Sequence, residues 1–333
     1  MTVRVGINGF GRIGRSYLRA ALASAADIEV VAVNDVTDAA TLGTLLEWDS
    51  ISGHLAGVAV EGDTIRVGDT SLRVLSQTDP AAIPWGDVGA DVVIESTGHF
   101  TDGAKARLHL QGGAKKVIIS APAKGDVPTF VLGVNDATLD PASSDVFSNG
   151  SCTTNSLAPL AKVLNDSFGI ESGLMTTIHA YTGDQRLHDA PHSDLRRARA
   201  AAVSTIPTSS GAAKAIGQVI PELDGLLTGF ALRVPVPVGS ITDLTAVLKT
   251  SATALEVNAA FKAAAAGPLA GYVQYSEAPL VSVDIVGNTH STIFDAPLTE
   301  SVGRQVKVLG WYDNEWGFSN RLVEFSERIG AAL

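Results

Sequence analysis

A glycine-rich turn near the start of the chain constrains its fold more than any other feature. Residues 3–8 alternate as a strand does, and Gly9-Phe10-Gly11-Arg12-Ile13-Gly14 follows them directly and opens a helical stretch. The first glycine permits a tight turn, the second lets the backbone approach a pyrophosphate, and the third allows the helix to pack closely on the strand. The pattern therefore predicts a dinucleotide-binding unit, with Gly9, Gly11, Arg12, Ile13 and Gly14 at the cofactor.

A carboxylate follows the second predicted strand. Residues 28–33 form an apolar run of the kind that is buried in a parallel sheet, and Asn34 and Asp35 come directly after it. Asp35 lies about 20 residues beyond Gly14, where a carboxylate can accept hydrogen bonds from the hydroxyls of an adenosine ribose. Since that carboxylate would repel a 2′-phosphate, we expect NAD as the cofactor in preference to NADP.

The two halves of the chain differ in pattern. Strand-like runs at 91–95 and 116–120 alternate with helical or loop segments, which predicts a doubly wound parallel sheet in the first half. After Gly150 the spacing favours an α+β half with a mixed or antiparallel sheet, so the fold class is α/β overall. The strands expected there are 174–181, 226–235, 240–248, 281–286 and 304–312. Helices are expected at 253–267, which opens with a capping box, and from about 316 to the C-terminus.

The chain has one cysteine in 333 residues, and it lies where a helix is predicted to begin. Small polar residues at 148–155 lead into the apolar periodicity of Leu157, Leu160 and Leu164. A thiol in the first turn of a helix faces unpaired N–H groups and the positive end of the helix dipole, which favour the thiolate. We therefore expect Cys152 to be an ionised nucleophile. The alternative is a buried cysteine that packs as a small hydrophobic residue.

A nucleophilic thiol needs a base, and one of the seven histidines ends a strand-like segment. His179 follows the alternation of residues 175–178, which can hold its imidazole rigidly. His188 and His192 have the i, i+4 spacing of a metal pair on a helix. Because Pro191 lies between them and no further cysteine or paired acid accompanies them, we expect a solvated loop and no metal.

Anion-binding side chains recur in the second half. They occur at 182–186, 196–199 and 208–211 and at Arg233. A run of charges usually forms a solvated face, but arginines beside hydroxyl groups also match the tetrahedral geometry of a phosphate. The repeated pattern predicts two phosphate sites.

The charge balance limits the partners of the chain. Lys and Arg total 24 against 35 Asp and Glu, and the formal net charge is -11, which disfavours general binding to nucleic acid or to anionic membranes. A single cysteine forms no internal disulfide, and the sequence shows neither a charged-then-apolar leader nor an apolar run of membrane-spanning length. We expect a cytoplasmic protein that acts on a small molecule.

The chain resembles the phosphorylating glyceraldehyde-3-phosphate dehydrogenases over nearly its full length. The segments that carry the resemblance are 7–15, 34–35, 96–98, 116–121, 151–155, His179, 194–199, 233–235 and 311–315. The resemblance implies a Rossmann domain made of residues 1–150 plus 316–333 and a catalytic domain of residues 151–315 with a mixed sheet. It also implies a homotetramer in which the segment 181–204 lies near a neighbouring subunit's cofactor.

The same resemblance implies a role for individual residues. Cys152 would attack the aldehyde carbon of glyceraldehyde 3-phosphate, His179 would act as the base, NAD would accept the hydride, and inorganic phosphate would release the thioester as 1,3-bisphosphoglycerate. The phosphate of the substrate is assigned to Thr182, Asp184 and Arg233, and the attacking phosphate to Ser151, Thr153, Arg197, Ser210 and Gly211. The cofactor is assigned also to Asn34, Asp35, Ser96, Thr97, Ser120 and Asn314.

Some positions depart from the pattern of many relatives. Ser156 stands where many have a second cysteine, and Ser210 where many have threonine, which suggests the hypothesis of an inhibitor-tolerant isozyme. Ala190 leaves more room beside Pro191 than a bulkier residue would, so the strictness of NAD over NADP stays open. Two other functions remain as alternatives: an erythrose-4-phosphate dehydrogenase, which hydrolyses its thioester, and a non-catalytic relative that binds NAD and RNA.

Overall fold

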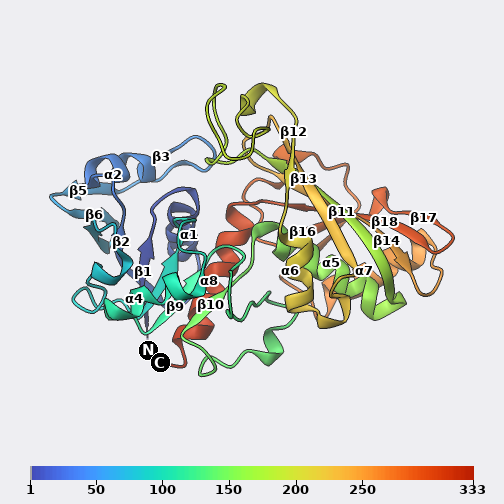
Figure 1. Cartoon of the computed structure of the whole chain (residues 1–333), viewed down its shortest axis with the longest axis horizontal. Coiled ribbons are helices and arrows are strands. Elements are labelled where there is room, and N and C mark those ends of the chain that lie inside the picture. The colour runs from blue at the N-terminus through green and yellow to red at the C-terminus, as the bar shows by residue number, and fades with distance from the viewer. Residues whose placement is uncertain (1) are drawn as a thin grey trace. The chain divides into compact units, whose positions relative to one another are not determined.

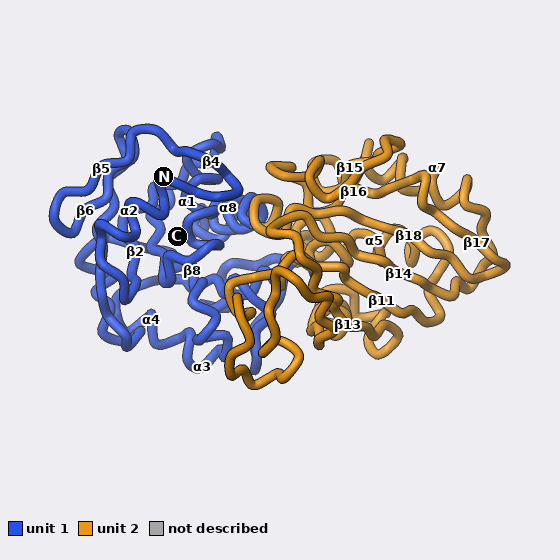
Figure 2. Tube along the Cα trace, turned by 90° about the horizontal axis from the view of Figure 1, so that it is seen from above, with its two compact units in different colours: residues 1–130, 139–150, 319–333 blue, residues 131–138, 151–318 orange. Residues whose placement is uncertain are grey.

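The chain folds as two compact units in a computed structural model that describes residues 2–333 (Figures 1 and 2). The first unit holds the residues up to Phe130, together with Leu139–Gly150 and Ser319–Leu333. The second unit holds Val131–Thr138 and Ser151–Phe318. Each unit has its own sheet and its own hydrophobic core.

The first unit is built on an eight-stranded sheet in the order β10-β9-β8-β1-β2-β7-β6-β5. Its strands are β1 (Val3–Asn8), β2 (Ile28–Asn34), β5 (Val58–Glu61), β6 (Thr64–Val67), β7 (Thr70–Leu75), β8 (Val92–Glu95), β9 (Lys116–Ile119) and β10 (Val146–Ser148). The strands from β10 to β7 run parallel, and β6 and β5 extend the edge in antiparallel fashion. Since β1 lies between β2 and β8, this is the doubly wound sheet that the sequence predicts.

Helices of the first unit join its strands, and one of them comes from the end of the chain. They are α1 (Arg12–Ala23), α2 (Ala39–Glu47), the short α3 (Gly103–Ala106) and α4 (Leu108–Gln111), and most of α8 (Trp316–Gly330); β3 (Trp48–Asp49) and β4 (Gly53–His54) form a separate ribbon. Phe325 of α8 packs against Phe130 and Phe147, with ring centroids 6.1 and 6.2 Å apart. The C-terminal helix is therefore part of the first unit's core.

The second unit contains a mixed sheet in the order β12-β13-β11-β14-β18-β16-β15, with β17 paired to β18. Its strands are β11 (Ile170–Ala180), β12 (Ile206–Ser209), β13 (Leu227–Val234), β14 (Ser240–Leu248), β15 (Val273–Ser276), β16 (Thr292–Asp295), β17 (Glu300–Val302) and β18 (Gln305–Tyr312). The long strand β11 runs parallel to β13 and antiparallel to β14. The sheet is therefore mixed, as the resemblance implies, and this decides between the mixed and antiparallel sheets that the spacing left open.

Three helices accompany this sheet: α5 (Cys152–Phe168), α6 (Ala212–Val219) and α7 (Ala254–Ala266). The apolar face of α5 is fully buried through Leu157, Leu160 and Leu164, in one cluster with residues of β11, β14 and β18. The expected capping box begins α7, where the Thr253 hydroxyl accepts from the Glu256 N–H and the Glu256 carboxylate accepts from the Thr253 N–H. Burial of α5 fixes the position of its first turn, which carries Cys152.

The strand predicted at 281–286 is wrong. Ser282–Ile285 form a 3₁₀ turn, in which the Asp284 N–H donates to the Val281 carbonyl at 3.0 Å and the Asp284 carboxylate accepts from the Val281 N–H at 2.8 Å. A side chain that bonds to its own local backbone competes with a strand ladder. Val281 and Val283 are accordingly exposed, whereas only Ile285 is buried.

Candidate active site

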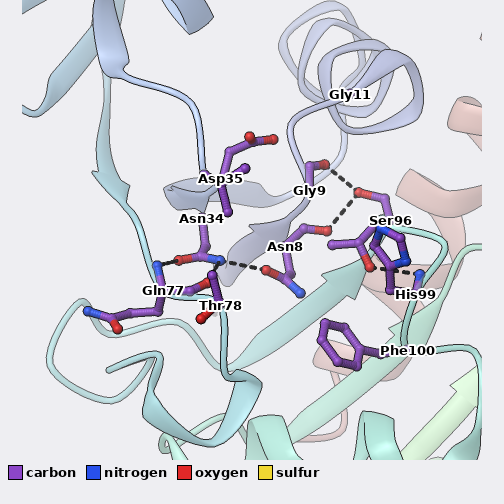
Figure 3. Close-up of a pocket in the computed structure, with 12 residues that line it drawn as sticks. Asn8, Gly9, Gly11, Asn34, Asp35, Gln77, Thr78, Ser96, His99 and Phe100 are labelled. Carbon is purple, nitrogen blue, oxygen red and sulfur yellow. Dashed lines mark hydrogen bonds between the residues drawn. The ribbon is translucent and has the colours of Figure 1, made fainter. Parts of the chain in front are cut away.

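The glycine turn of the first unit opens onto a pocket of about 410 Å³ at the carboxyl ends of β1, β2 and β8 (Figure 3). Six of the residues predicted at the cofactor line it: Gly9, Gly11, Asn34, Asp35, Ser96 and Thr97. The other residues that line it had no role predicted from the sequence; they are Asn8, Val36, Gln77, Thr78, His99 and Phe100. In a doubly wound sheet this is the edge at which ligands bind, because the strands on either side connect in opposite directions.

The three glycines of the turn meet different demands. Gly9 has φ +90°, a conformation that side chains rarely adopt, and a Cβ on Gly14 would lie 2.3 Å from the Gly9 carbonyl oxygen. A Cβ on Gly11 would meet nothing within 4 Å, and Gly11 precedes α1 as an N-cap without a side-chain cap. The space and the N–H groups at Gly11 fit a pyrophosphate, so the residues present fit a dinucleotide.

Buried polar side chains connect the walls of this pocket. One Asp35 carboxylate oxygen accepts the Phe10 N–H at 2.8 Å and so ties the carboxylate to the glycine turn. The Asn34 amide donates to Asn8 Oδ1 at 2.8 Å, and the Asn8 amide donates to the fully buried Glu95 at 2.6 Å. Glu95 also accepts the Thr97 N–H at 2.9 Å. The only sequence signal for Asn8 and Glu95 was their position at the ends of predicted strands.

Five of the residues predicted at the cofactor do not line the pocket: Arg12, Ile13, Gly14 and Ser120 of the first unit, and Asn314 of the second unit. Gly14 packs α1 onto β1, and Ile13 lies half-buried in the first turn of α1. The Arg12 guanidinium forms an ion pair with Asp49. A contact from Arg12 to the cofactor would therefore come from its backbone N–H, at the start of α1. The Ser120 hydroxyl donates to the Glu95 carbonyl at 3.0 Å, one strand away from the pocket.

In the second unit the first turn of α5 and the end of β11 bring a thiol and an imidazole together. The Ser151 hydroxyl caps α5 by accepting the Thr154 N–H at 3.0 Å, as the polar octet around the cysteine indicates. Cys152 is the next residue, and its Sγ lies 3.5 Å from His179 Nε2. The predicted pair therefore forms within one unit.

The tautomer of His179 follows from its other nitrogen. His179 Nδ1 lies 2.6 Å from the Ala180 carbonyl oxygen, which can only accept, so Nδ1 carries the proton. Arg233 Nη1 also lies 3.2 Å from Nδ1, but its donated hydrogen bonds go to the Ala180 carbonyl at 3.2 Å and the Thr182 hydroxyl at 2.9 Å. The lone pair of Nε2 therefore faces the sulfur, as a general base requires.

Burial and charge both act on the protonation of this pair. Burial raises the pKa of the Cys152 thiol, whereas the charge of Arg233 lowers it. Burial and the charge of Arg233 lower the pKa of His179 to about 3. Desolvation therefore opposes the ionised thiol that the sequence predicts and favours a neutral imidazole beside it. The ionised thiol stays a prediction.

Four of the predicted phosphate ligands, Thr182, Asp184, Arg197 and Arg233, form one connected cluster. Arg233 Nη1 donates to the Thr182 hydroxyl, which in turn donates to Asp184. Asp184 pairs with Arg197 at 2.6 Å, and Arg197 Nε donates to the Thr208 hydroxyl at 2.9 Å. Burial opposes ionisation of Asp184, but the Thr182 hydroxyl and Arg197 hold the pKa of its carboxyl below the usual range. The two expected clusters thus adjoin through the Asp184–Arg197 ion pair.

Two further predicted phosphate residues, Ser210 and Gly211, follow one end of this cluster in sequence, and Asn314 is connected to the strand that carries His179. Arg197 Nη2 donates to the Ser209 carbonyl at 3.4 Å, next to Ser210 and to Gly211, which precedes α6. Asn314 is linked to the histidine strand, because the Ser240 hydroxyl accepts the Ala180 N–H at 3.1 Å and donates to Asn314 Oδ1 at 3.0 Å.

Several polar residues of the second unit were given no individual role from the sequence. They are Gln185, Asp194, Ser240 and Tyr312. Gln185 Oε1 accepts the Thr182 N–H at 3.2 Å, and Asp194 accepts from the Thr208 hydroxyl at 2.5 Å. The contacts of Asp194, Ser240 and Tyr312 join segments distant in sequence, so no local motif marks these three.

Two negative findings concern the described residues. Among residues 2–333 there is no group of three or more His, Cys, Asp or Glu side chains that could hold a metal ion, and His188 and His192 lie in irregular chain between β11 and β12. No described helix combines the length and the apolar character that a membrane crossing requires.

Comparison with known proteins identifies the family. Residues 3–103 match the model described as glyceraldehyde 3-phosphate dehydrogenase, NAD binding domain, and residues 151–314 match the C-terminal domain of the same enzyme. The chain is 60% identical to glyceraldehyde-3-phosphate dehydrogenase 2 of Streptomyces arenae, 61% to glyceraldehyde-3-phosphate dehydrogenase 1 of Streptomyces avermitilis and 62% to glyceraldehyde-3-phosphate dehydrogenase of Mycobacterium avium, over 100% of both chains each time. The chain belongs to the glyceraldehyde-3-phosphate dehydrogenase family.

Membership of the glyceraldehyde-3-phosphate dehydrogenase family confirms several expectations. The resemblance, the α/β fold class with its mixed second sheet, and NAD as the cofactor are all confirmed. The chain is an NAD-dependent oxidoreductase of this family, and its substrate is a small molecule.

Proposed function

We propose that the chain oxidises glyceraldehyde 3-phosphate with NAD and inorganic phosphate to 1,3-bisphosphoglycerate, as a glycolytic enzyme. The observation that carries the proposal is the Cys152 Sγ at 3.5 Å from the unprotonated Nε2 of His179. That pair can form a covalent adduct with an aldehyde, because a neutral imidazole beside a thiol accepts its proton as sulfur attacks.

Catalysis at this pair takes two stages. In the first, the Cys152 thiol proton moves to His179 Nε2 as sulfur bonds to the aldehyde carbon, and it passes from there to the oxygen of the hemithioacetal. His179 then takes that proton from the oxygen as hydride leaves the carbon, which gives the thioester. Bound NAD supplies the acceptor for the hydride that this oxidation releases. In the second, inorganic phosphate attacks the thioester carbon, the C–S bond breaks, and an acyl phosphate leaves Cys152.

The arginine cluster supports two adjacent phosphate sites. We assign the phosphate of the substrate to Arg233, Thr182 and Asp184, where the buried Arg233 Nε has no protein partner and is free to bind an anion. The attacking phosphate is assigned to Ser151, Thr153, Arg197, Ser210 and Gly211. Asp184 accepts from Thr182 and pairs with Arg197, so its role is to orient these donors.

The cofactor is assigned to the pocket of the first unit. We propose that Gly9, Gly11, Arg12, Ile13 and Gly14 hold its pyrophosphate through backbone contacts, and that Asp35 accepts from its ribose. The other cofactor residues are Asn34, Ser96, Thr97, Ser120 and Asn314. The proposed domains are residues 1–150 plus 316–333 for NAD and 151–315 for catalysis. The two compact units support this division, except that Val131–Thr138 and residues 316–318 belong to the second unit.

We also propose a homotetramer in the cytoplasm. Leu187, Leu195 and Val203 are 75–81% exposed on the segment between β11 and β12, and large exposed apolar side chains favour burial against another subunit. Light scattering of the purified enzyme should give four times the mass of the chain. A mass equal to that of one chain would contradict this assembly.

The decisive assay follows NADH formation from glyceraldehyde 3-phosphate with and without inorganic phosphate. With phosphate we expect sustained turnover; without it we expect a burst of about one NADH per active site, because the thioester has no acceptor. Sustained turnover without phosphate would favour the erythrose-4-phosphate dehydrogenase alternative. Absence of any NADH would favour a non-catalytic binding protein.

A finer proposal concerns tolerance to electrophilic inhibitors. Ser156 lies fully buried one turn after Cys152, and its hydroxyl is 3.0 Å from Thr242 Oγ1 and 3.2 Å from Thr292 Oγ1. A cysteine there would place a second thiol behind the nucleophile. We expect Ser156→Cys combined with Ser210→Thr to raise the rate of inactivation by an epoxide. An unchanged rate would contradict the inhibitor-tolerant hypothesis.

A further inference from the structure

A fully buried serine joins the strand of the proposed base to a residue assigned to the cofactor. Ser240 begins β14, and its hydroxyl oxygen accepts the Ala180 N–H at 3.1 Å. The same hydroxyl donates to Asn314 Oδ1 at 3.0 Å, and Asn314 is itself only 3% exposed. The three residues come from separate segments of the chain, and no step of the proposed reaction uses Ser240.

The backbone on both sides of Asn314 is held by the buried carboxylate of Asp313. One Asp313 oxygen accepts the Glu315 N–H at 2.9 Å and the Trp316 N–H at 2.8 Å. The other oxygen accepts the Gly287 N–H at 2.8 Å. With the backbone held in this way, the orientation of the Asn314 amide depends on the contacts of its own side chain.

The single proton of the Ser240 hydroxyl decides which end of that amide faces it. The Ala180 N–H can only donate, so the Ser240 oxygen accepts it and the hydroxyl proton goes to Asn314 Oδ1. If the amide were turned end for end, Nδ2 would face the Ser240 oxygen and the buried hydroxyl proton would lose its acceptor, which costs free energy. Asn314 Nδ2 is thus directed away from Ser240, and within residues 2–333 it donates to no protein group.

We propose that Ser240 is a positioning residue, which orients the Asn314 amide so that its Nδ2 donates to the carboxamide oxygen of bound NAD. The inference rests on the proposed function, which assigns Asn314 to the cofactor. An amide N–H matches a carbonyl oxygen, and the carboxamide is the carbonyl group of the nicotinamide. A donor that is oriented in advance loses less conformational entropy on binding than one that must first be ordered. Ser240 therefore adds affinity for the nicotinamide part of NAD without touching it.

The test compares the binding of NAD with that of ADP-ribose, which lacks the nicotinamide, by calorimetry of the full-length enzyme. For Ser240→Ala we expect NAD to bind about three- to tenfold more weakly, the size of one lost hydrogen bond, and ADP-ribose to bind as it does to the wild type. A merely structural role would weaken both ligands. Unchanged NAD affinity, or equal weakening for NAD and ADP-ribose, would overturn the proposal.

Asn314→Ala supplies the matched background, because it removes the amide that Ser240 orients. Alone it should weaken NAD binding and leave ADP-ribose binding unchanged. Ser240→Ala should then weaken NAD binding no further in that background, since two residues that act through one contact are not additive. A full additional loss in the double variant would overturn the role of Ser240 alone. Unchanged NAD affinity in Asn314→Ala would instead contradict the cofactor assignment in the proposed function, and the role of Ser240 with it.

Alkylation of Cys152 by iodoacetamide is the control, because it needs the catalytic pair and no cofactor. Ser240 also holds the Ala180 N–H next to His179, so distortion of the pair would slow alkylation. We expect Ser240→Ala to be alkylated at the wild-type rate; slowing in parallel with the loss of NAD affinity would overturn the specific role. If Ser240→Ala fails to fold, Ser240→Cys decides by binding: its weakly donating thiol should reduce NAD affinity and spare ADP-ribose. Wild-type affinity for NAD in that variant would overturn the proposal.

Discussion

His179 is held neutral by the residues around it. Its ring is buried, its Nδ1–H is bound to the Ala180 carbonyl, and the charge of Arg233 lies beside it. These contacts disfavour the imidazolium ion. The imidazole is therefore ready to accept a proton from Cys152 and unable to hold it once the thiol is acylated.

The lowered pKa of His179 predicts how stability depends on pH. In the unfolded chain the imidazole binds a proton below its ordinary pKa of 6.5, whereas in the folded chain it does so only below about 3. Folding is therefore opposed increasingly as pH falls from 6.5 toward 3. Relative to His179→Gln, the wild type should lose about 2 kcal/mol of unfolding free energy between pH 7 and pH 5.

Urea unfolding of both proteins at the two pH values measures this difference. All other titrating groups are common to the two chains, so the variant serves as the control. Equal losses of stability in the two proteins would show that His179 is not held neutral by the fold.

Arg233 acts on both members of the catalytic pair. Its charge lowers the pKa of Cys152 and that of His179. Arg233→Met should therefore raise the apparent pKa of iodoacetamide alkylation, and it should also raise the KM for glyceraldehyde 3-phosphate because an anion ligand is lost. Alkylation and substrate affinity like those of wild type would contradict both roles.

At the scale of elements, the sequence predicted the structure correctly where contacts between residues close along the chain determine it. The turn from β1 into α1, the cap of α5 and the capping box of α7 all form where the sequence indicates. The strand expected at 281–286 failed because Asp284 bonds to its own turn. The links from Tyr312 to Thr153 and Thr177, and from Glu95 to Asn8, join residues distant in sequence, so periodicity carried no sign of them.

Alanine substitutions at the two later glycines of the turn should have opposite effects: one should impair folding and the other should impair cofactor binding. Gly14→Ala would place a Cβ 2.3 Å from the Gly9 carbonyl oxygen, so it should displace α1 from β1 and lower the melting temperature. Gly11→Ala meets no protein atom within 4 Å, so it should fold normally and bind NAD at least tenfold more weakly, because its Cβ takes space at the helix N-terminus.

Thermal unfolding and titration with NADH, followed by fluorescence, separate the two effects. Each variant is the control for the other, since both add one methyl group to the same turn. Normal NADH affinity in Gly11→Ala would contradict the placement of the pyrophosphate at this position.

At the scale of the whole molecule, the chain has one cysteine among its 333 residues. Cys152 is partly exposed, and Ser156 offers no second thiol one helical turn away. All thiol chemistry of the chain therefore belongs to the proposed nucleophile. The family and the cofactor could be read from ordered motifs along the sequence, whereas the groups that act on the pKa of this thiol, such as Arg233, are distant in sequence and are brought to it only by the fold.

Thiol oxidation of this protein should therefore be confined to Cys152. We expect peroxide to convert Cys152 to sulfenic acid, or to a mixed disulfide when a small thiol is added, with no internal disulfide. Mass spectrometry of the treated protein should show the change at Cys152 in proportion to lost activity. Loss of activity with an intact Cys152 would contradict this assignment.

The central claim is that Cys152 carries the substrate as a thioester. The most direct measurement is the intact mass of enzyme mixed rapidly with NAD and glyceraldehyde 3-phosphate in the absence of phosphate and then quenched in acid. The account predicts one acyl group per chain, located on Cys152, lost when phosphate is added and absent from Cys152→Ser. Formation of NADH with no acyl adduct, or turnover by Cys152→Ser at the wild-type rate, would contradict it.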